Sequence, residues 1–122
     1  MNIHLRSKQT KAVFVLNNAV MATATVSIIT ALQAQARANY FLLTQLGDRL
    51  VADDPLPDSA AGIWRVPVLL SYPALGPIGN VGEILVSATN DEVISHTPLE
   101  EMKAASIALY ERRRNEIEAP LP

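Results

Sequence analysis

The chain lacks cysteine and has few histidines. The absence of cysteine among its 122 residues excludes disulfides, thiolate zinc sites and cysteine nucleophiles. The two histidines, His4 and His96, are 92 positions apart in the sequence, and a metal site needs several converging ligands. The formal net charge of −2, with both signs mixed, is not typical of a nucleic-acid-binding protein. We therefore expect no cofactor, no metal and no nucleic acid.

Charge is missing from the stretch between Lys11 and Arg37. Residues 12–32 are long and apolar enough for a membrane span or a signal segment, and basic residues precede them. However, Asn17 and Asn18 interrupt the run, and threonine and serine dilute it. We therefore favour a cytoplasmic protein, with export or membrane anchoring through residues 12–32 as the alternative.

The apolar content, 49% of residues, is sufficient for a hydrophobic core, and the length suits a single domain. Residues 1–24 contain three basic residues and no acid, so their charge differs from that of the acidic remainder. This asymmetry predicts a leader over residues 1–24, disordered or helical, before an α+β domain over residues 25–119 and a tail over residues 120–122. Met21 is then a candidate for the natural start.

A helix is predicted from Ser27 to Leu46, because apolar residues recur at spacings of three and four and Gly47 suits a helix stop. A second helix is predicted from Pro98 to Ile117. Thr97 and Glu100 have the spacing of a capping box at its start. The predicted buried face of the first helix consists of Ile29, Leu32, Ala36, Tyr40, Leu43 and Leu46. That of the second consists of Leu99, Met102, Ser106, Leu109, Arg113 and Ile117.

Between the helices, residues 64–72 alternate apolar and other side chains, as a strand does. Pro67 predicts that this strand lies at a sheet edge, or that the Pro67 nitrogen points away from its neighbour. Residues 51–62 are rich in Asp and Pro and predict a loop, while residues 73–82 predict a ten-residue glycine-containing connector. Residues 84–94 predict a hairpin turning near Asn90 and Asp91, which tolerate the left-handed conformation.

The elements together predict a two-layer α+β domain of order αβββα. Its three-stranded antiparallel sheet is covered by the N-terminal and C-terminal helices. The strand face that carries Trp64 holds the larger side chains, so we expect it to pack against both helices.

The hairpin at residues 84–94 resembles the last hairpin of the PepSY domain, in which an apolar strand is followed by Asp-Ala-x-Thr-Gly-Glu and two apolar residues. Ala88, Glu92, Val93 and Ile94 match in register, while Ser87, Asn90 and Asp91 depart from the pattern. The match is looser over residues 25–95. The resemblance implies a binding or inhibitory module, frequently extracytoplasmic, and it implies no catalytic residues.

Three groups of residues suggest chemistry, and each has a simpler explanation. Ser95 and His96 beside Glu92 have no accompanying second base or oxyanion motif, and His96 adjoins the predicted helix cap. The acidic run of Asp53, Asp54 and Asp58 lacks the glycine and terminal Glu of a calcium loop, so a solvated turn is favoured. The glycines at 76, 79 and 82 have no accompanying Lys for phosphate, so a flexible connector is favoured. We therefore expect no enzyme.

The favoured function is a non-catalytic protein-interaction or regulatory module, whose partner is another protein or a second copy. One candidate surface joins the strand around Pro67 to the following connector, whose apolar residues have no evident cover. The other is the basic run near the end of the last helix, although a salt-bridged solvent face explains it as well. The partner-binding candidates are Pro67, Leu75, Ile78, Val81, Arg112, Arg113 and Arg114. A secreted or membrane-anchored PepSY-like accessory protein and an antitoxin-like neutralising partner are the alternatives.

Overall fold

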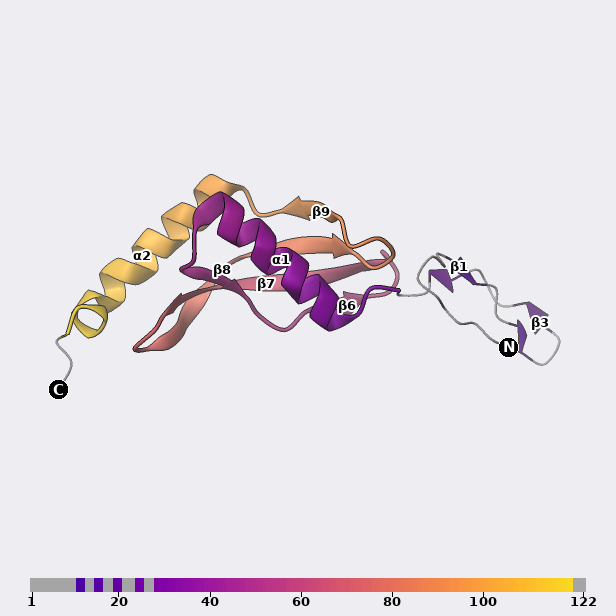
Figure 1. The fold of residues 1–122 in the computed structure, drawn as a ribbon, viewed down its shortest axis with the longest axis horizontal. Coiled ribbons are helices and arrows are strands. Elements are labelled where there is room, and N and C mark those ends of the chain that lie inside the picture. The colour runs from indigo at the N-terminus through magenta and orange to yellow at the C-terminus, as the bar shows by residue number, and fades with distance from the viewer. Residues whose placement is uncertain (1–10, 13–14, 17–18, 21–23, 26–27, 120–122) are drawn as a thin grey trace.

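The computed structural model describes residues 11–12, 15–16, 19–20, 24–25 and 28–119. Near the N-terminus, β1 (Lys11–Ala12) pairs with β4 (Ala24–Thr25), and β2 (Val15–Leu16) pairs with β3 (Ala19–Val20), both antiparallel (Figure 1). The other residues of the predicted leader and the predicted tail lie outside the described residues.

The main body is α+β, as predicted, with two helices and a curled antiparallel sheet (Figure 1). The prediction of three strands is wrong, because the sheet has five, in the order β5-β7-β8-β9 with β6 also paired to β7. Two of them, β5 and β6, are three residues each, too short to show a period-two pattern. The elements are α1 (Ala31–Leu46), β5 (Leu50–Ala52), β6 (Leu56–Asp58), β7 (Ile63–Tyr72), β8 (Gly76–Ser87), β9 (Val93–His96) and α2 (Leu99–Ile117).

The strands β5 and β6 replace much of the loop predicted over residues 51–62. Both pair with β7 on the same side, so they form one edge of the sheet with an interruption between Ala52 and Leu56. The backbone N–H of Asp53 donates to the Pro67 carbonyl across this interruption, at 2.8 Å. Because N and O of one strand residue point to the same side, the Pro67 nitrogen faces the interruption. β7 is an inner strand, because β5 and β6 pair with one side of it and β8 with the other, so the predicted sheet edge is wrong. The second alternative holds, since the Pro67 nitrogen points away from β8 and into the break between β5 and β6.

β7 and β8 form a long hairpin, and this contradicts the predicted ten-residue connector. β8 begins at Gly76, directly after a turn over residues 73–75, and Tyr72 pairs with Gly76. Gly76 has φ of 78°, a conformation that glycine adopts without steric cost. Register shifts after Val68 and Leu70 bend the ribbon. The Gly and Pro content of this segment suggested a flexible loop, but the residues belong to a strand.

The hairpin between β8 and β9 confirms the turn predicted near Asn90 and Asp91. Asp91 has φ of 53° and is the one non-glycine residue with positive φ in the described part of the chain. The Ser87 hydroxyl accepts from the backbone N–H groups of Thr89, at 3.1 Å, and Asn90, at 3.3 Å. Local side-chain bonding of this kind stabilises a tight turn.

Both helices contribute to one core on a single face of the sheet. Val66, Val68 and Leu70 of β7 alternate into this core and are at most 2% exposed. Trp64 packs against the same cluster, and its Nε1 donates to the carbonyl of Ile29, just before α1, at 2.8 Å. The prediction that the Trp64 face packs on the helices is therefore confirmed.

α1 begins at Ala31, later than predicted, and it turns a different face to the sheet. Its buried residues are Ala34, Ala38 and Leu42, each with no exposed surface. The small alanine side chains let the helix lie close to the strands, so the interface between helix and sheet is closely packed. The predicted face is wrong over its central part, where Leu32, Tyr40 and Leu43 are 74%, 63% and 59% exposed.

The ends of the helices also differ from the sequence-based expectation. Thr30 and Gln33 form a reciprocal capping box at α1, with bonds of 2.8 and 3.1 Å. At α2 the predicted capping box of Thr97 and Glu100 is wrong, because Pro98 is the N-cap and no side chain caps the helix. The Thr97 hydroxyl instead accepts from the backbone N–H of Glu83 at 3.0 Å. Thr97 therefore attaches the start of α2 to the sheet.

The predicted buried face of α2 is confirmed over its first half. Met102 has no exposed surface, and Leu99 and Leu109 pack against the core. Gly82 of β8 lies against the start of α2. A Cβ at this position would be 2.8 Å from Thr97 Oγ1 and 2.9 Å from Met102 Cγ. The absence of a side chain at this position thus permits the close approach of α2 to β8.

The buried face of α1 can be tested with two matched substitutions. Ala38→Leu overfills the contact between α1 and the sheet and should lower the free energy of unfolding by about 1–3 kcal/mol. Ala36→Leu, on the exposed face, should change it by less than about 0.5 kcal/mol at protein concentrations at which the chain is monomeric. Urea titrations followed by circular dichroism measure both. If Ala36→Leu lowers the free energy of unfolding more than Ala38→Leu does, the buried face of α1 is the one predicted from the spacing of its apolar residues.

Candidate functional site

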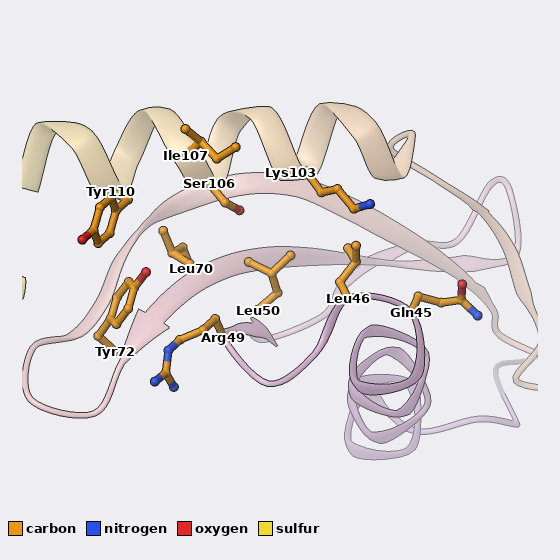
Figure 2. Close-up of a pocket in the computed structure, with 10 residues that line it drawn as sticks. All are labelled: Gln45, Leu46, Arg49, Leu50, Leu70, Tyr72, Lys103, Ser106, Ile107 and Tyr110. Atoms are coloured by element: carbon orange, nitrogen blue, oxygen red, sulfur yellow. The ribbon is translucent and has the colours of Figure 1, made fainter. Parts of the chain in front are cut away.

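A cavity of about 500 Å³ lies between the end of α1, the strands β5 and β7, and α2 (Figure 2). Its size falls within the range of small-molecule sites, about 300–1,000 Å³. Four separate elements contribute to its wall, so no continuous stretch of sequence encodes it. The residues that line it are Gln45, Leu46, Arg49, Leu50, Leu70, Tyr72, Lys103, Ser106, Ile107 and Tyr110.

The inner wall of the cavity is apolar. Leu50 and Leu70, which face each other across β5 and β7, are 6% and 2% exposed and belong to the core. Leu46 continues this wall from α1, and Ile107 adds an apolar side chain from α2 that is 62% exposed. The cavity is therefore an extension of the hydrophobic core toward solvent.

Two tyrosines close one end of the cavity. The rings of Tyr72 and Tyr110 lie 6.3 Å apart at an angle of 42°, so β7 and α2 meet through an aromatic contact. The Arg49 guanidinium lies 5.0 Å from the centre of the Tyr72 ring, and Arg114 lies 5.7 Å from that of Tyr110. The Tyr110 hydroxyl donates to the Glu118 carboxylate. These contacts hold both rings in place.

The rim of the cavity is basic. Arg49 and Lys103 line it from opposite sides, one next to β5 and the other on α2 (Figure 2). Among the described residues that form its wall there is no Asp or Glu. Each cation has an acidic neighbour: Asp48 Oδ1 lies 3.9 Å from Arg49 Nη1, and Glu100 Oε2 lies 3.5 Å from Lys103 Nζ. Both pairs are well exposed to solvent, so each contributes little.

The cavity was not anticipated from the sequence, although Ser106 offered a signal. This small polar residue sits between Met102 and Leu109 on the face predicted to be buried. Its hydroxyl donates to the Met102 carbonyl at 2.8 Å, within its own helix. Ser106 therefore needs no partner outside α2, and a larger side chain would occupy the space that it leaves open.

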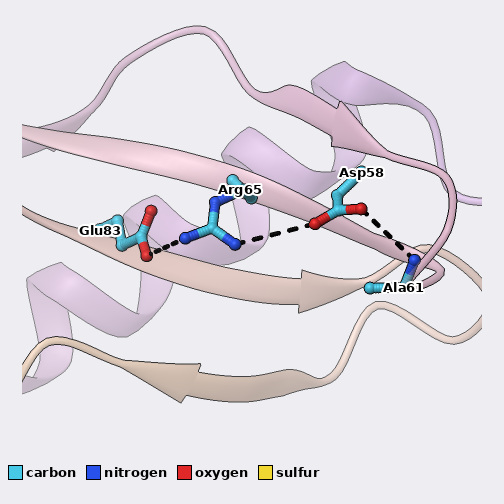
Figure 3. A network of polar contacts seen from close by, with 4 residues as sticks. All are labelled: Asp58, Ala61, Arg65 and Glu83. Atoms are coloured by element: carbon cyan, nitrogen blue, oxygen red, sulfur yellow. Dashed lines mark hydrogen bonds and ion pairs between the residues drawn. The ribbon is translucent and has the colours of Figure 1, made fainter.

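The opposite face of the sheet carries a chain of charged residues (Figure 3). Arg65 of β7 donates through Nη2 to Glu83 Oε2 of β8 at 2.6 Å, and its Nη1 lies 3.8 Å from Asp58 Oδ2 of β6. The three side chains are 33–43% exposed. Asp58 also accepts weakly from the Ala61 N–H at 3.4 Å. The charges pair with one another, so we interpret this chain as a cross-strand structural contact.

The connector residues predicted to bind a partner are only partly accessible. Leu75, in the turn between β7 and β8, is 37% exposed, and Pro67 is half-buried. The expectation that Ile78 and Val81 lack cover is wrong, because Ile78 packs against the core and Val81 is only 6% exposed. Ile78 and Val81 belong to β8, so they pack against the core as part of the sheet. In the predicted loop they would have had no such cover.

The basic run of α2 is largely paired within its own helix. Arg114 Nη2 lies 2.9 Å from Glu111 Oε1, and Arg113 donates to Glu116. Arg113 also has non-helical angles, φ −115° and ψ 15°, which mark a kink near the end of α2. In the part of the chain that the structure describes, Arg112 forms no ion pair and is exposed. Of the three arginines it is the one without an ion pair among the described residues.

Ser95 and His96 do not form a pair. Neighbouring residues of a strand point to opposite faces, and both lie in β9. His96 Nδ1 lies 2.7 Å from the Thr97 carbonyl oxygen, and its ring lies 4.9 Å from that of Phe41 of α1. His96 thus packs where β9 leads into α2. This agrees with the simpler explanation, in which His96 adjoins the start of the helix and has no catalytic role.

Other site classes find no support in the described ranges. No group of three or more His, Asp or Glu side chains there is placed to hold a metal ion. Neither of the two helices has the length and hydropathy that crossing a bilayer requires.

Comparisons of the chain with protein families, with curated proteins and with solved structures found no match. The PepSY resemblance of residues 84–94 therefore stays a prediction. The secreted accessory and antitoxin-like alternatives also stay predictions.

The ion pair between Arg65 and Glu83 predicts a small, salt-dependent contribution to stability. Glu83→Gln keeps the shape of the side chain but removes its charge, so it should cost less than about 1 kcal/mol at low salt. The cost should shrink toward zero near 1 M salt, where the Debye length is about 3 Å. Urea titrations at both salt concentrations measure it.

The matched control is Glu92→Gln, which removes an exposed acid without an ion pair among the residues described. It should have no comparable salt-dependent cost. A loss at Glu83 that persists undiminished at high salt would show that the contact does not act through charge.

Proposed function

We propose that the protein is a non-catalytic interaction module that binds a second copy of itself through the outer face of α1. The name outer stripe denotes Leu32, Ala36, Tyr40 and Leu43. The observation that carries the proposal is the exposure of its three large residues, 74%, 63% and 59%. Large apolar side chains gathered on one face are typical of interaction surfaces.

The outer stripe lies opposite the residues that α1 buries. Ala34, Ala38 and Leu42 face the sheet, so the large apolar side chains cannot serve the core of the same molecule. Spacings of four and three place the stripe along one side of a helix about four turns long. A partner that covers it would remove these side chains from water, which is the main source of association energy.

The charge of α1 favours a second copy as the partner. Arg37 is the only charged residue in the helix, and its guanidinium lies 5.7 Å from the Tyr40 ring centre. Interface cores are poor in charge and rich in Tyr and Arg, as this surface is. In a two-fold dimer the same surface meets itself, so a nearly uncharged helix brings few like charges together.

The contacts of α1 with its own molecule make the surface rigid before binding. The capping box of Thr30 and Gln33 fixes its first turn. Two side chains tie the helix to β5, since Gln35 Nε2 donates to the Ala52 carbonyl at 3.1 Å and Asn39 Oδ1 accepts from the Ala52 N–H at 2.8 Å. A surface that is already ordered loses little entropy on association.

The proposal predicts a dimer that a single charge in the outer stripe disrupts. Leu43→Glu should convert the dimer to a monomer, because a carboxylate would be buried without a partner. Ile94→Glu is the matched control, since Ile94 is also apolar and 54% exposed but lies on β9. Analytical ultracentrifugation over a range of concentrations measures the state of all three proteins.

A cross-linking experiment separates this interface from other dimers. The natural chain has no cysteine, so Tyr40→Cys introduces the only thiol. Mild oxidation should link two copies if the outer stripes meet, and Ile94→Cys should link poorly. A wild-type protein that stays monomeric at its highest attainable concentration, or a dimer that Leu43→Glu leaves intact, would overturn the proposal.

A further inference from the structure

We propose that the cavity between α1, β5, β7 and α2 binds a small amphipathic carboxylate of the medium-chain fatty acid class. The proposal rests on an apolar wall whose described rim carries two cations, Arg49 and Lys103, and no acid. It goes beyond the proposed dimer and uses none of its residues, because the outer stripe and the cavity wall are separate sets. Each can therefore fail without the other.

The apolar wall defines the body of the ligand. Leu50 and Leu70 form the inner surface at 6% and 2% exposure, and Leu46 and Ile107 flank it. These are aliphatic side chains, so they suit a flexible hydrocarbon chain without requiring particular hydrogen bonds. Small-molecule sites have this form, with an apolar lining and a few convergent polar groups.

The space for this chain exists because of Ser106. On the same face of α2, Met102 packs into the core without exposed surface, and Leu109 lies against Gly79. Ser106, between them, turns its hydroxyl back to the Met102 carbonyl at 2.8 Å. α2 therefore contacts the sheet at Met102 and at Leu109 and leaves a gap between them at Ser106. Packed residues thus border the gap on both sides.

The two cations at the rim define the head of the ligand as an anion. The chain as a whole has a net charge of −2, yet the described wall of the cavity contains Arg49 and Lys103 and no acid. Their neighbours Asp48 and Glu100 are 80% and 86% exposed and lie at 3.9 and 3.5 Å. Such solvated pairs are weak, so a carboxylate held at the rim can compete with them.

Arg49 is the better ordered of the two cations. Its carbonyl accepts from the Ser71 N–H at 2.8 Å, which fixes its backbone beside β7. Its guanidinium lies 5.0 Å from the Tyr72 ring centre, a cation–π distance. A planar guanidinium that is already positioned can bind a carboxylate through two parallel hydrogen bonds. Lys103 lies on the opposite side of the cavity, on α2, so it adds positive charge to the rim but does not share the carboxylate that Arg49 binds (Figure 2).

The experiment uses decanoate and decyltrimethylammonium, which share a ten-carbon chain but carry opposite charges. Binding is followed by methyl chemical shifts in the full chain. Decanoate should shift the methyl groups of Leu46, Leu50, Leu70 and Ile107, and saturate with one molecule per chain. The cationic amphiphile should bind at least tenfold more weakly, although the protein is net negative.

Charge-removing variants test the head group. Arg49→Gln should weaken decanoate binding about tenfold, which corresponds to about 1.4 kcal/mol. Lys103→Gln should weaken it by less, because Lys103 lies on the opposite side of the cavity (Figure 2). Arg112→Gln is the matched control, because it removes an exposed cation that lies outside the cavity. It should leave the affinity unchanged. Equal weakening by all three variants would show attraction to overall charge and would overturn the proposal.

A cavity-filling variant tests the chain. Ser106→Leu should abolish decanoate shifts at Leu50 and Leu70 while the thermal unfolding temperature is kept or raised. If this variant fails to fold, the comparison of Arg49→Gln with Arg112→Gln still decides. No saturable shift with decanoate, equal affinity for the cationic amphiphile, or shifts confined to the outer stripe would each overturn the proposal.

Discussion

The closeness of α1 to the sheet is the constraint on which the rest of the molecule depends. Ala34 and Ala38 are the contact residues, and neither has exposed surface. Small side chains occupy most of this contact together with Leu42, while three large apolar residues of the helix, Leu32, Tyr40 and Leu43, lie on the opposite side. The same closeness brings Gln35 and Asn39 within reach of the Ala52 backbone. One choice of side-chain size thus determines the packing, the orientation and the exposed surface of α1.

Features encoded by adjacent residues could be predicted from the sequence. The turn at Asn90 and Asp91 depends on bonds within a few residues, and the alternation around Trp64 reflects a strand with one buried face. The face of α1 could not be predicted, because spacing locates an apolar stripe but does not say whether the sheet or another molecule covers it. β6 was missed since three residues that include Pro57 have no strand pattern of their own.

The cavity illustrates the same limit at the level of the site. Its cations and its leucines come from elements far apart in the sequence, and only folding brings them together. Lys103 in isolation is an ordinary exposed lysine on a helix. The position of Ser106 on an otherwise apolar face was the one local sign that the helix and the sheet are not in contact throughout.

The broken edge formed by β5 and β6 affects how the protein self-associates at high concentration. An intact edge strand is a template on which other chains can add without limit. Here the edge is split into two three-residue pieces, and prolines occupy positions 55 and 57. The opposite edge strand, β9, is four residues long. Open-ended growth from the β5–β6 edge is thereby discouraged, and a closed assembly through a helix needs no strand edge at all.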